Sequence, residues 1–219
     1  MNQNEKIKKH LSLVLEENKK TNLTRIVDEK SALLLHIEDS IAGLADLNES
    51  PQGLYGDMGS GAGYPGIPLA ILSKRKTVLI DSIKKKAQAL ESMIRELEID
   101  DYVNVYEGRI EELSLQKPAS FSVLTARALA QLPSLLELAA PLLIHSGRLI
   151  CYKSQLPNDE LKKAVDLEDR IGLKLIKKRE YYLSDQETKR CLVIFEKEHE
   201  SKLKLPRRIG MAQKRPLSS

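Results

Sequence analysis

One short stretch constrains the fold more than any other, the glycine-rich run over residues 54–66, LYGDMGSGAGYPG. An apolar run ends at Asp57, glycines follow at alternate positions, and Pro65 stands where a helix can begin. This order predicts a strand, a tight turn and a helix, because glycine permits turn angles closed to other residues and proline fits a first helical turn. Glycines also let a ligand lie against the main chain, although plain turn chemistry explains the same pattern equally well.

A second acidic residue supports a ligand site at this turn. Residues 77–81 form a β-branched run that ends at Asp81, which lies 22 positions after Gly59. A carboxylate at about this spacing, at the end of the second strand, holds the ribose hydroxyls of a nucleotide-like ligand. Two acids that each end a predicted strand, Asp57 and Asp81, therefore face one glycine turn.

The acid beside the turn bears on which nucleotide-like ligand fits. Residues 61–66 match the dinucleotide fingerprint, but that register places Pro65 inside the phosphate-binding turn. The carboxylate of Asp57 would repel a pyrophosphate, whereas it can accept hydrogen bonds from an ammonium group. The pattern therefore favours S-adenosylmethionine, which joins adenosine to an amino acid, over a nicotinamide dinucleotide.

The order of predicted elements indicates an α/β fold. Beyond the glycine turn, strands and helices alternate, which predicts a parallel sheet with helices on both faces. The last two strands have no helix between them, so the final one should run antiparallel, as in methyltransferase sheets and unlike dinucleotide dehydrogenases. The expected strands after the first cover residues 77–81, 103–106, 120–127, 147–153, 173–178 and 189–195. The expected helices cover residues 4–20, 28–47, 66–72, 83–98, 132–140 and 158–170.

Length and composition set the domain organisation. The 219 residues, 42% hydrophobic and 30% charged, suit one globular α/β domain with an appended helical segment. We expect a helical segment over residues 1–50 packed on the core, the sheet domain over residues 51–200 and a basic tail over residues 201–219. The polar first residues and the lack of a long apolar run predict a cytoplasmic protein that does not contact the membrane.

Composition also excludes some kinds of site. Aromatic residues make up 4% of the chain and Trp is absent, which argues against an aromatic platform for single-stranded nucleic acid. Cys151 and Cys191 lie in apolar runs and are expected to be buried and reduced. The four histidines lack the spacing of zinc ligands, so no metal site is predicted.

The carboxyl-terminal residues differ in charge from the rest of the chain. Residues 201–219 hold six basic residues and no acid, so the formal charge of +4 leaves +4 − 6 = −2 for the first 200 residues. A solvated, disordered tail explains this pattern, and so does an arm that binds phosphate. The tail mixes apolar and turn residues with its charges, which favours the phosphate-binding arm.

Several blocks together identify a family resemblance that covers nearly the whole chain. They are residues 57–69 (DMGSGAGYPGIPL), 22–24 (NLT), 36–40 (HIEDS), 79–82 (LIDS), 126–128 (ARA) and 152–153 (YK). These blocks resemble the bacterial small-subunit ribosomal RNA guanine-N7 methyltransferases, also called glucose-inhibited division protein B. The resemblance implies a class I, Rossmann-like methyltransferase with a seven-stranded sheet and an antiparallel last strand. It also implies S-adenosylmethionine as methyl donor and one guanine of 16S ribosomal RNA as acceptor.

The resemblance implies site residues as well. With the two residues that the turn pattern adds, Asp57 and Gly61, the expected donor site comprises Asp57, Gly59, Gly61, Tyr64, Asp81, Ser82, Ile110, Glu111 and Arg127. Asp81 would hold the ribose, and Ile110 with Glu111 would meet the adenine edge. The expected RNA-binding residues are Lys153, Arg207, Arg208, Lys214 and Arg215.

Arg127, His36 and Asp39 are the expected catalytic residues. Methylation of guanine N7 removes no proton, because that nitrogen already presents a lone pair, so the reaction needs alignment rather than a base. A guanidinium at position 127 suits the O6/N7 edge of guanine or a carboxylate of the donor. The alternatives are a buried salt bridge from Arg127 to Glu111 or Asp81, and a packing role for the His36 helix.

Three other functions remain open on the sequence. A nicotinamide-dependent oxidoreductase would use a similar sheet, and an RNA-binding assembly factor would keep the fold without catalysis. A methyltransferase that acts on a protein or a small molecule would bind the donor but not RNA. The expected partner is small-subunit ribosomal RNA or the ribosomal subunit, and the protein is expected to act as a monomer.

Overall fold

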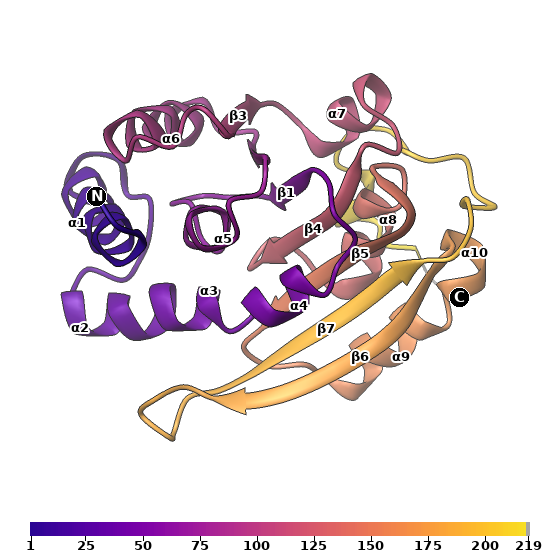
Figure 1. Ribbon diagram of the computed structural model, residues 1–219. Coiled ribbons are helices and arrows are strands. Elements are labelled where there is room, and N and C mark those ends of the chain that lie inside the picture. Colours follow the sequence, from indigo (N-terminus) through magenta and orange to yellow (C-terminus); the bar gives the residue numbers. More distant parts are fainter. Residues whose placement is uncertain (218–219) are drawn as a thin grey trace.

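The computed structural model describes residues 1–217 as a seven-stranded sheet between two layers of helices (Figure 1). The strand order is β3-β2-β1-β4-β5-β7-β6. All neighbouring strands are parallel except at β7, which runs antiparallel to β5 and to β6. The strands are β1 (Tyr55–Met58), β2 (Thr77–Asp81), β3 (Val103–Glu107), β4 (Phe121–Arg127), β5 (Leu143–Lys153), β6 (Leu173–Tyr182) and β7 (Lys189–Lys197). The predicted parallel sheet with an antiparallel last strand is confirmed.

Two hydrophobic layers flank the sheet. On one face, α5 and α6 pack with the amino-terminal helices against inward residues such as Leu79 and Val103. On the other face, α7 to α11 pack against inward residues of β4, β5 and β7 such as Leu124 and Phe195. The helices are α1 (Gln3–Thr21), α2 (Glu29–Ala32), α3 (Asp39–Ile41), α4 (Leu44–Asn48), α5 (Gly66–Ser73), α6 (Lys84–Glu96), α7 (Ile110–Gln116), α8 (Leu132–Ala139), α9 (Asn158–Val165), α10 (Glu168–Ile171) and α11 (Met211–Lys214), with a π-helical turn, η1 (Leu33–Glu38). Within residues 1–217, no helix is both long and apolar enough to cross a membrane.

The structure differs from the predicted single helix over residues 28–47 in two respects, a π-helical turn and a break at Ala42 and Gly43 between α3 and α4. Asp28 caps the helix as expected, since its side chain accepts a hydrogen bond from the backbone N–H of Ser31 at 2.8 Å. The helix then widens into η1, where the backbone N–H of Asp39 donates to the carbonyl of Leu34, five residues earlier. A π-helical turn changes the direction in which the following side chains point. It lies at the two residues predicted to be catalytic, His36 and Asp39.

The amino-terminal helices are fixed to the sheet by polar contacts at several points. Figure 1 shows α2, α3 and α4 nearly in line between α5 and the β6–β7 hairpin. The buried carboxylate of Asp46 pairs with Lys177 at 2.7 Å and with Arg179 at 2.8 Å, both on β6. The hydroxyl of Tyr152 on β5 donates to the carbonyl of Ser40 at 2.8 Å. These contacts place the His36 segment beside the end of β4.

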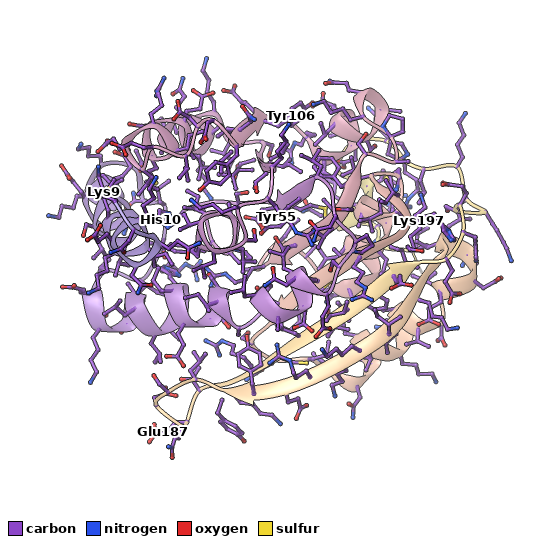
Figure 2. All side chains as sticks on the ribbon, viewed as in Figure 1. Lys9, His10, Tyr55, Tyr106, Glu187 and Lys197 are labelled. Atoms are coloured by element: carbon purple, nitrogen blue, oxygen red, sulfur yellow. The ribbon has the colours of Figure 1, made fainter. Side chains whose placement is uncertain are left out.

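The carboxyl-terminal residues expected as a basic tail pack against the core. Ala212 on α11 is buried, and Leu203, Leu205 and Leu217 pack against the layer that contains α8. Figure 1 shows this yellow segment beside α8, whereas the tip of the β6–β7 hairpin, at Glu187 in Figure 2, projects away from the body. Ser218 and Ser219 lie outside the described residues. The apolar residues among the charges therefore attach the segment to the domain.

Candidate functional site

A hollow lies at the carboxyl ends of β1, β2 and β3, where ligands of open α/β sheets bind. Three segments after these strands line it: Gly59 after β1, residues 81–83 after β2 and residues 108–111 after β3. Leu129 and Leu138 contribute apolar side chains to its lining. Its other lining residues are Ile80, Lys86, Ala128 and Gln213. We call it the donor hollow.

Asp81 holds the glycine turn in place at this hollow. One carboxylate oxygen accepts the backbone N–H of Gly61 at 2.9 Å, and the other accepts the N–H of Ile83 at 2.8 Å. Each carboxylate oxygen carries two lone pairs, so capacity remains for two hydroxyl donors. Asp81 and Ser82 both line the hollow, so a vicinal diol such as that of ribose can reach this carboxylate.

The turn has positive φ at three glycines, Gly59, Gly61 and Gly63. Gly59 has φ +72°, and a Cβ there would lie 2.8 Å from Leu129 Cδ1. Gly63 has φ +89°, and a Cβ there would lie 2.6 Å from Ile67 Cδ1. Positive φ is open to glycine at no steric cost, so the alternate glycines predicted to form the turn are confirmed in that structural role.

Asp57 lies in β1 directly before the glycine turn, as predicted. Its side chain is buried beneath the turn, where it accepts the hydroxyl of Thr125 at 2.6 Å and the backbone N–H of Gly66 at 3.1 Å. Burial raises the pKa of Asp57 to about 6, although these two donors act in the opposite direction. These bonds join β1, β4 and α5; Asp57 is 1% exposed and does not line the hollow, so its hydrogen bond to the donor's ammonium group stays a prediction.

Glu111 and Ile110 line the hollow as expected, with an added contact from the carboxyl-terminal segment. One oxygen of Glu111 accepts the backbone N–H of Gly210 at 2.7 Å. Gln213, four residues before the last described residue, forms part of the wall. Sequence reasoning missed Gln213, because nothing in the local pattern of the tail indicates that it meets the end of β3.

A second hollow adjoins the first on the opposite side of Ala128, which lines both. Its charged lining residues are Asp39, Arg127, Lys153 and Arg190. Its remaining lining residues are Ile26, Leu35, Ala128, Ala130, Leu135, Tyr152, Ser154 and Gln155. We call it the acceptor hollow. Three cationic side chains and one carboxylate give it an excess of positive charge.

Arg127 and Asp39 form the central ion pair of the acceptor hollow. Arg127 Nη1 lies 3.1 Å from Asp39 Oδ2, and the side chains are only 15% and 6% exposed. Asp39 Oδ1 also accepts the hydroxyl of Tyr181 at 2.8 Å and lies 3.7 Å from Arg190 Nε. The alternative prediction that Arg127 forms a buried salt bridge is thus confirmed, but its partner is Asp39 rather than Glu111 or Asp81.

His36 lies against the same guanidinium and is neutral. Arg127 Nη2 donates to His36 Nδ1 at 3.3 Å, so Nε2 carries the proton and donates to the Thr24 hydroxyl at 3.0 Å. Burial and the charge of Arg127 lower the pKa of His36 to about 4. Its ring stacks on Tyr64 with centroids 4.5 Å apart and planes 12° apart. The sequence pair His36 and Asp39 is therefore brought together around Arg127.

Tyr64 and His10 form a buried stack behind the glycine turn. Tyr64, expected in the donor site, is 4% exposed and lines neither hollow. The other face of its ring lies 4.5 Å from His10, whose Nε2 donates to the carbonyl of Ala62 at 3.0 Å. Burial lowers the pKa of His10 to about 3. Among residues 1–217, the Tyr64 hydroxyl and His10 Nδ1 are buried without a hydrogen-bond partner.

The five residues expected to bind RNA fall into two groups. Lys153 pairs with Glu160 at 2.6 Å, and Arg207 forms two hydrogen bonds with the buried carboxylate of Glu137 at 2.6 and 2.5 Å. Arg207 therefore anchors the carboxyl-terminal segment. The second group comprises Arg208, Lys214 and Arg215, whose exposed side chains form no ion pair with residues 1–217.

The fold and the donor hollow define a class I S-adenosylmethionine-dependent methyltransferase. The O-methyltransferase from Bacillus cereus, solved with S-adenosylhomocysteine, superposes with a TM-score of 0.62 at 17% identity, over 87% of this chain and 91% of that chain. Geranyl diphosphate methyltransferase, solved with S-adenosylmethionine, gives a TM-score of 0.56 at 12% identity, over 72% of this chain and 84% of that chain.

Sequence comparison gives the family. The family model of rRNA small subunit methyltransferase G (GidB) matches residues 3–168. A relative from Streptococcus suis (strain 05ZYH33), named ribosomal RNA small subunit methyltransferase G, is 37% identical over 214 residues, 95% of this chain and 89% of its own. One of the same name from Carboxydothermus hydrogenoformans is 38% identical over 217 residues, with the same coverage. The chain belongs to the GidB family.

Proposed function

We propose that the protein transfers a methyl group from S-adenosylmethionine to N7 of a guanine in small-subunit ribosomal RNA. The observation that carries this proposal is the meeting of two unlike hollows at Ala128, after β4. One hollow has the glycine turn and acidic residues that suit an adenosine-containing donor. The other is lined by arginine and lysine. The relatives named as ribosomal RNA methyltransferases supply the class of acceptor.

The residues of the donor hollow fit S-adenosylmethionine. Asp81, which keeps unused acceptor capacity, would hold the ribose, and the apolar side chains of Ile110, Leu129 and Leu138 suit the faces of a purine. The positive φ at Gly59 brings the main chain to the surface of the hollow. When bound, S-adenosylmethionine supplies an electrophilic methyl group on a positively charged sulfur.

The acceptor hollow is suited to orient a guanine rather than to remove a proton. N7 of guanine presents a lone pair, so attack on a methyl group needs alignment and no general base. His36 is neutral with its Nδ1 hydrogen bonded to Arg127, and Asp39 is paired. Arg127 and Arg190 both line the hollow, and guanidinium groups pair well with the O6/N7 edge of guanine.

The surrounding surface supports an RNA partner. Arg208, Lys214 and Arg215 are exposed on the carboxyl-terminal segment, which also borders the donor hollow through Gln213. We assign them to phosphate contacts outside the acceptor hollow. Lys153 lines the acceptor hollow itself, where Glu160 fixes its ammonium group. One chain supplies both hollows, which supports action as a monomer.

The test is transfer of labelled methyl from S-adenosylmethionine to small ribosomal subunits that lack their N7-methylguanine, with protein-free ribosomal RNA alongside. We expect label in the RNA, recovered as N7-methylguanine, and its loss in Asp81→Ala. Lys76→Ala, an exposed change at the opposite edge of the sheet, should leave transfer unchanged.

Other outcomes would assign the chain to the competing functions. Donor binding without label in any RNA would indicate a protein or small molecule as acceptor. RNA binding without donor binding would indicate an assembly factor, and binding of a nicotinamide dinucleotide alone would indicate an oxidoreductase. Each of these results would overturn the proposal.

A further inference from the structure

The carboxyl-terminal segment, residues 205–215, is fixed against the donor hollow by contacts on both sides of Gln213. Before it, the N–H of Gly210 donates to Glu111 at 2.7 Å, and the carbonyl of Ala212 accepts the hydroxyl of Ser134 at 2.6 Å. After it, the carbonyl of Arg215 accepts from Arg207 at 2.8 Å. The backbone of Gln213 is therefore held in place without any contact from its own side chain.

Arg207 makes this attachment strong. Its guanidinium meets the carboxylate of Glu137 through two hydrogen bonds, at 2.6 and 2.5 Å, and the Glu137 side chain is only 2% exposed. Paired, charge-assisted bonds of this kind fix orientation as well as distance. Two segments about 70 residues apart in sequence, α8 and the carboxyl-terminal segment, thus form one rigid wall.

The side-chain carboxamide of Gln213 forms part of that wall and has no hydrogen-bond partner among residues 1–217. Gln213 lines the donor hollow. The nearby lining residues Ile110, Leu129 and Leu138 are apolar. A carboxamide presents one acceptor and two donors, which match the amino group and an adjacent ring nitrogen of adenine.

We propose that Gln213 recognises the adenine of the methyl donor and that Glu111 is a positioning residue that holds Gln213 in place. This inference rests on the donor role of the hollow proposed above. It gives the carboxyl-terminal segment a second role besides phosphate contact. It also gives Glu111 a positioning role, through the bond from one of its oxygens to Gly210.

The test measures binding of S-adenosylhomocysteine and of its purine-riboside analogue, in which hydrogen replaces the 6-amino group, by calorimetry. We expect the wild-type protein to prefer the adenine compound by about tenfold, the discrimination typical of a bidentate pair. Gln213→Leu keeps the wall but lacks the carboxamide, so it should bind the adenine compound about tenfold more weakly. The analogue keeps the ring nitrogen but not the amino group, so Gln213→Leu should weaken its binding less than it weakens binding of the adenine compound.

A matched control and a second variant make the result decisive. Lys204→Ala changes an exposed residue immediately before this segment, outside the hollow, and should keep the wild-type preference. Glu111→Ala should reduce the preference while Gln213 is still present. If Gln213→Leu weakens both compounds equally, or neither, the recognition role is overturned. If the wild-type protein binds neither compound, the donor assignment itself fails.

Discussion

The donor hollow and the acceptor hollow meet at Ala128, yet they are built in different ways. The glycine turn of the donor hollow is fixed by a contact between residues 20 positions apart, Asp81 and Gly61, whereas its carboxyl-terminal wall is fixed by Glu111 and Gly210, 99 positions apart. The acceptor hollow depends on pairs such as Arg127 with Asp39, 88 positions apart, and Asp39 with Tyr181, 142 positions apart. Local sequence therefore specifies the glycine turn of the donor hollow, whereas only the complete fold specifies the acceptor hollow.

The difference extends to electrostatics. The donor hollow has an acidic residue, Asp81, whose oxygens are bound by backbone N–H groups. The acceptor hollow holds guanidinium groups around one buried carboxylate. Changes in one hollow should therefore affect one ligand, and the following variants test that separation.

The largest effect is expected for Arg127→Met. It leaves the buried carboxylate of Asp39 without its nearest cation, although Tyr181 and Arg190 remain, so the free energy of unfolding should fall by about 3 kcal/mol. Methyl transfer to RNA should be lost, while S-adenosylhomocysteine affinity stays within about threefold. Urea unfolding and calorimetry measure the two quantities.

The double variant Arg127→Met/Asp39→Asn separates stability from recognition. It removes the unpaired charge, so most of the lost stability should return without any return of activity. A collapse of donor affinity in either variant would show that Arg127 serves the donor hollow, as the family resemblance implied, and the separation of the two hollows would be wrong.

Asp81→Ala should weaken binding of the donor without weakening binding of RNA. It removes the proposed ribose acceptor and two contacts that hold the turn, so S-adenosylhomocysteine affinity should fall by about 30-fold, or about 2 kcal/mol. Affinity for RNA in the absence of donor should not change. Ser73→Ala, near the opposite edge of the sheet, is the control for a general loss of structure. An unchanged donor affinity would contradict the proposal that Asp81 holds the ribose.

The free energy of unfolding should fall at acid pH because of His10 and His36, the two buried histidines that pack against Tyr64. The folded-state pKa of His10 is lowered to about 3, so between pH 6.5 and 3 only the unfolded chain binds this proton. Stability is therefore present above pH 6.5 and is lost as the pH falls, by about 2 kcal/mol between pH 7.5 and 5 for this residue. His36 acts in the same direction.

The His10→Gln variant isolates that contribution. Its urea midpoint should change less than that of the wild type between pH 7.5 and 5. Asp57, whose pKa is raised to about 6, acts in the opposite direction, since its contribution is present at low pH and is lost as pH rises through 6. It is present in both proteins and cancels in the comparison. Equal pH dependence in the two proteins would contradict a neutral, buried His10.

The smallest effect is expected for Arg208 and Arg215, the exposed arginines of the carboxyl-terminal segment. Arg208→Ala/Arg215→Ala should weaken RNA binding modestly and reduce the slope of log affinity against log salt by about 1.5, because each phosphate contact contributes close to one. Filter binding from 50 to 200 mM salt measures this slope in the range where phosphate contacts matter. Lys76→Ala/Lys117→Ala is a charge-matched control, and an equal change there would mean that only net charge matters.

The contrast between the hollows also explains what could be predicted from the sequence. The glycine turn and Asp81 follow from local chemistry, and the parallel sheet with an antiparallel last strand follows from alternation and the final hairpin. Asp57 was placed in the right strand, but its burial beneath the turn could not be predicted, because its partner Thr125 lies 68 positions later. The partner of Arg127 and the position of Gln213 depend on packing between distant segments, which leaves no periodic pattern in the chain.

The position of the amino-terminal helices has a consequence for the order of folding during synthesis. Asp39 and Asp46 emerge early, but their partners Tyr181, Lys177 and Arg179 lie 131 to 142 positions later. Until that hairpin exists, the docked position of these helices would bury the carboxylate of Asp46 without a cation and leave Asp39 with Arg127 alone, which is unfavourable. The first segment to be made therefore completes its packing only after one of the last, and the acceptor hollow is absent from every shorter nascent chain.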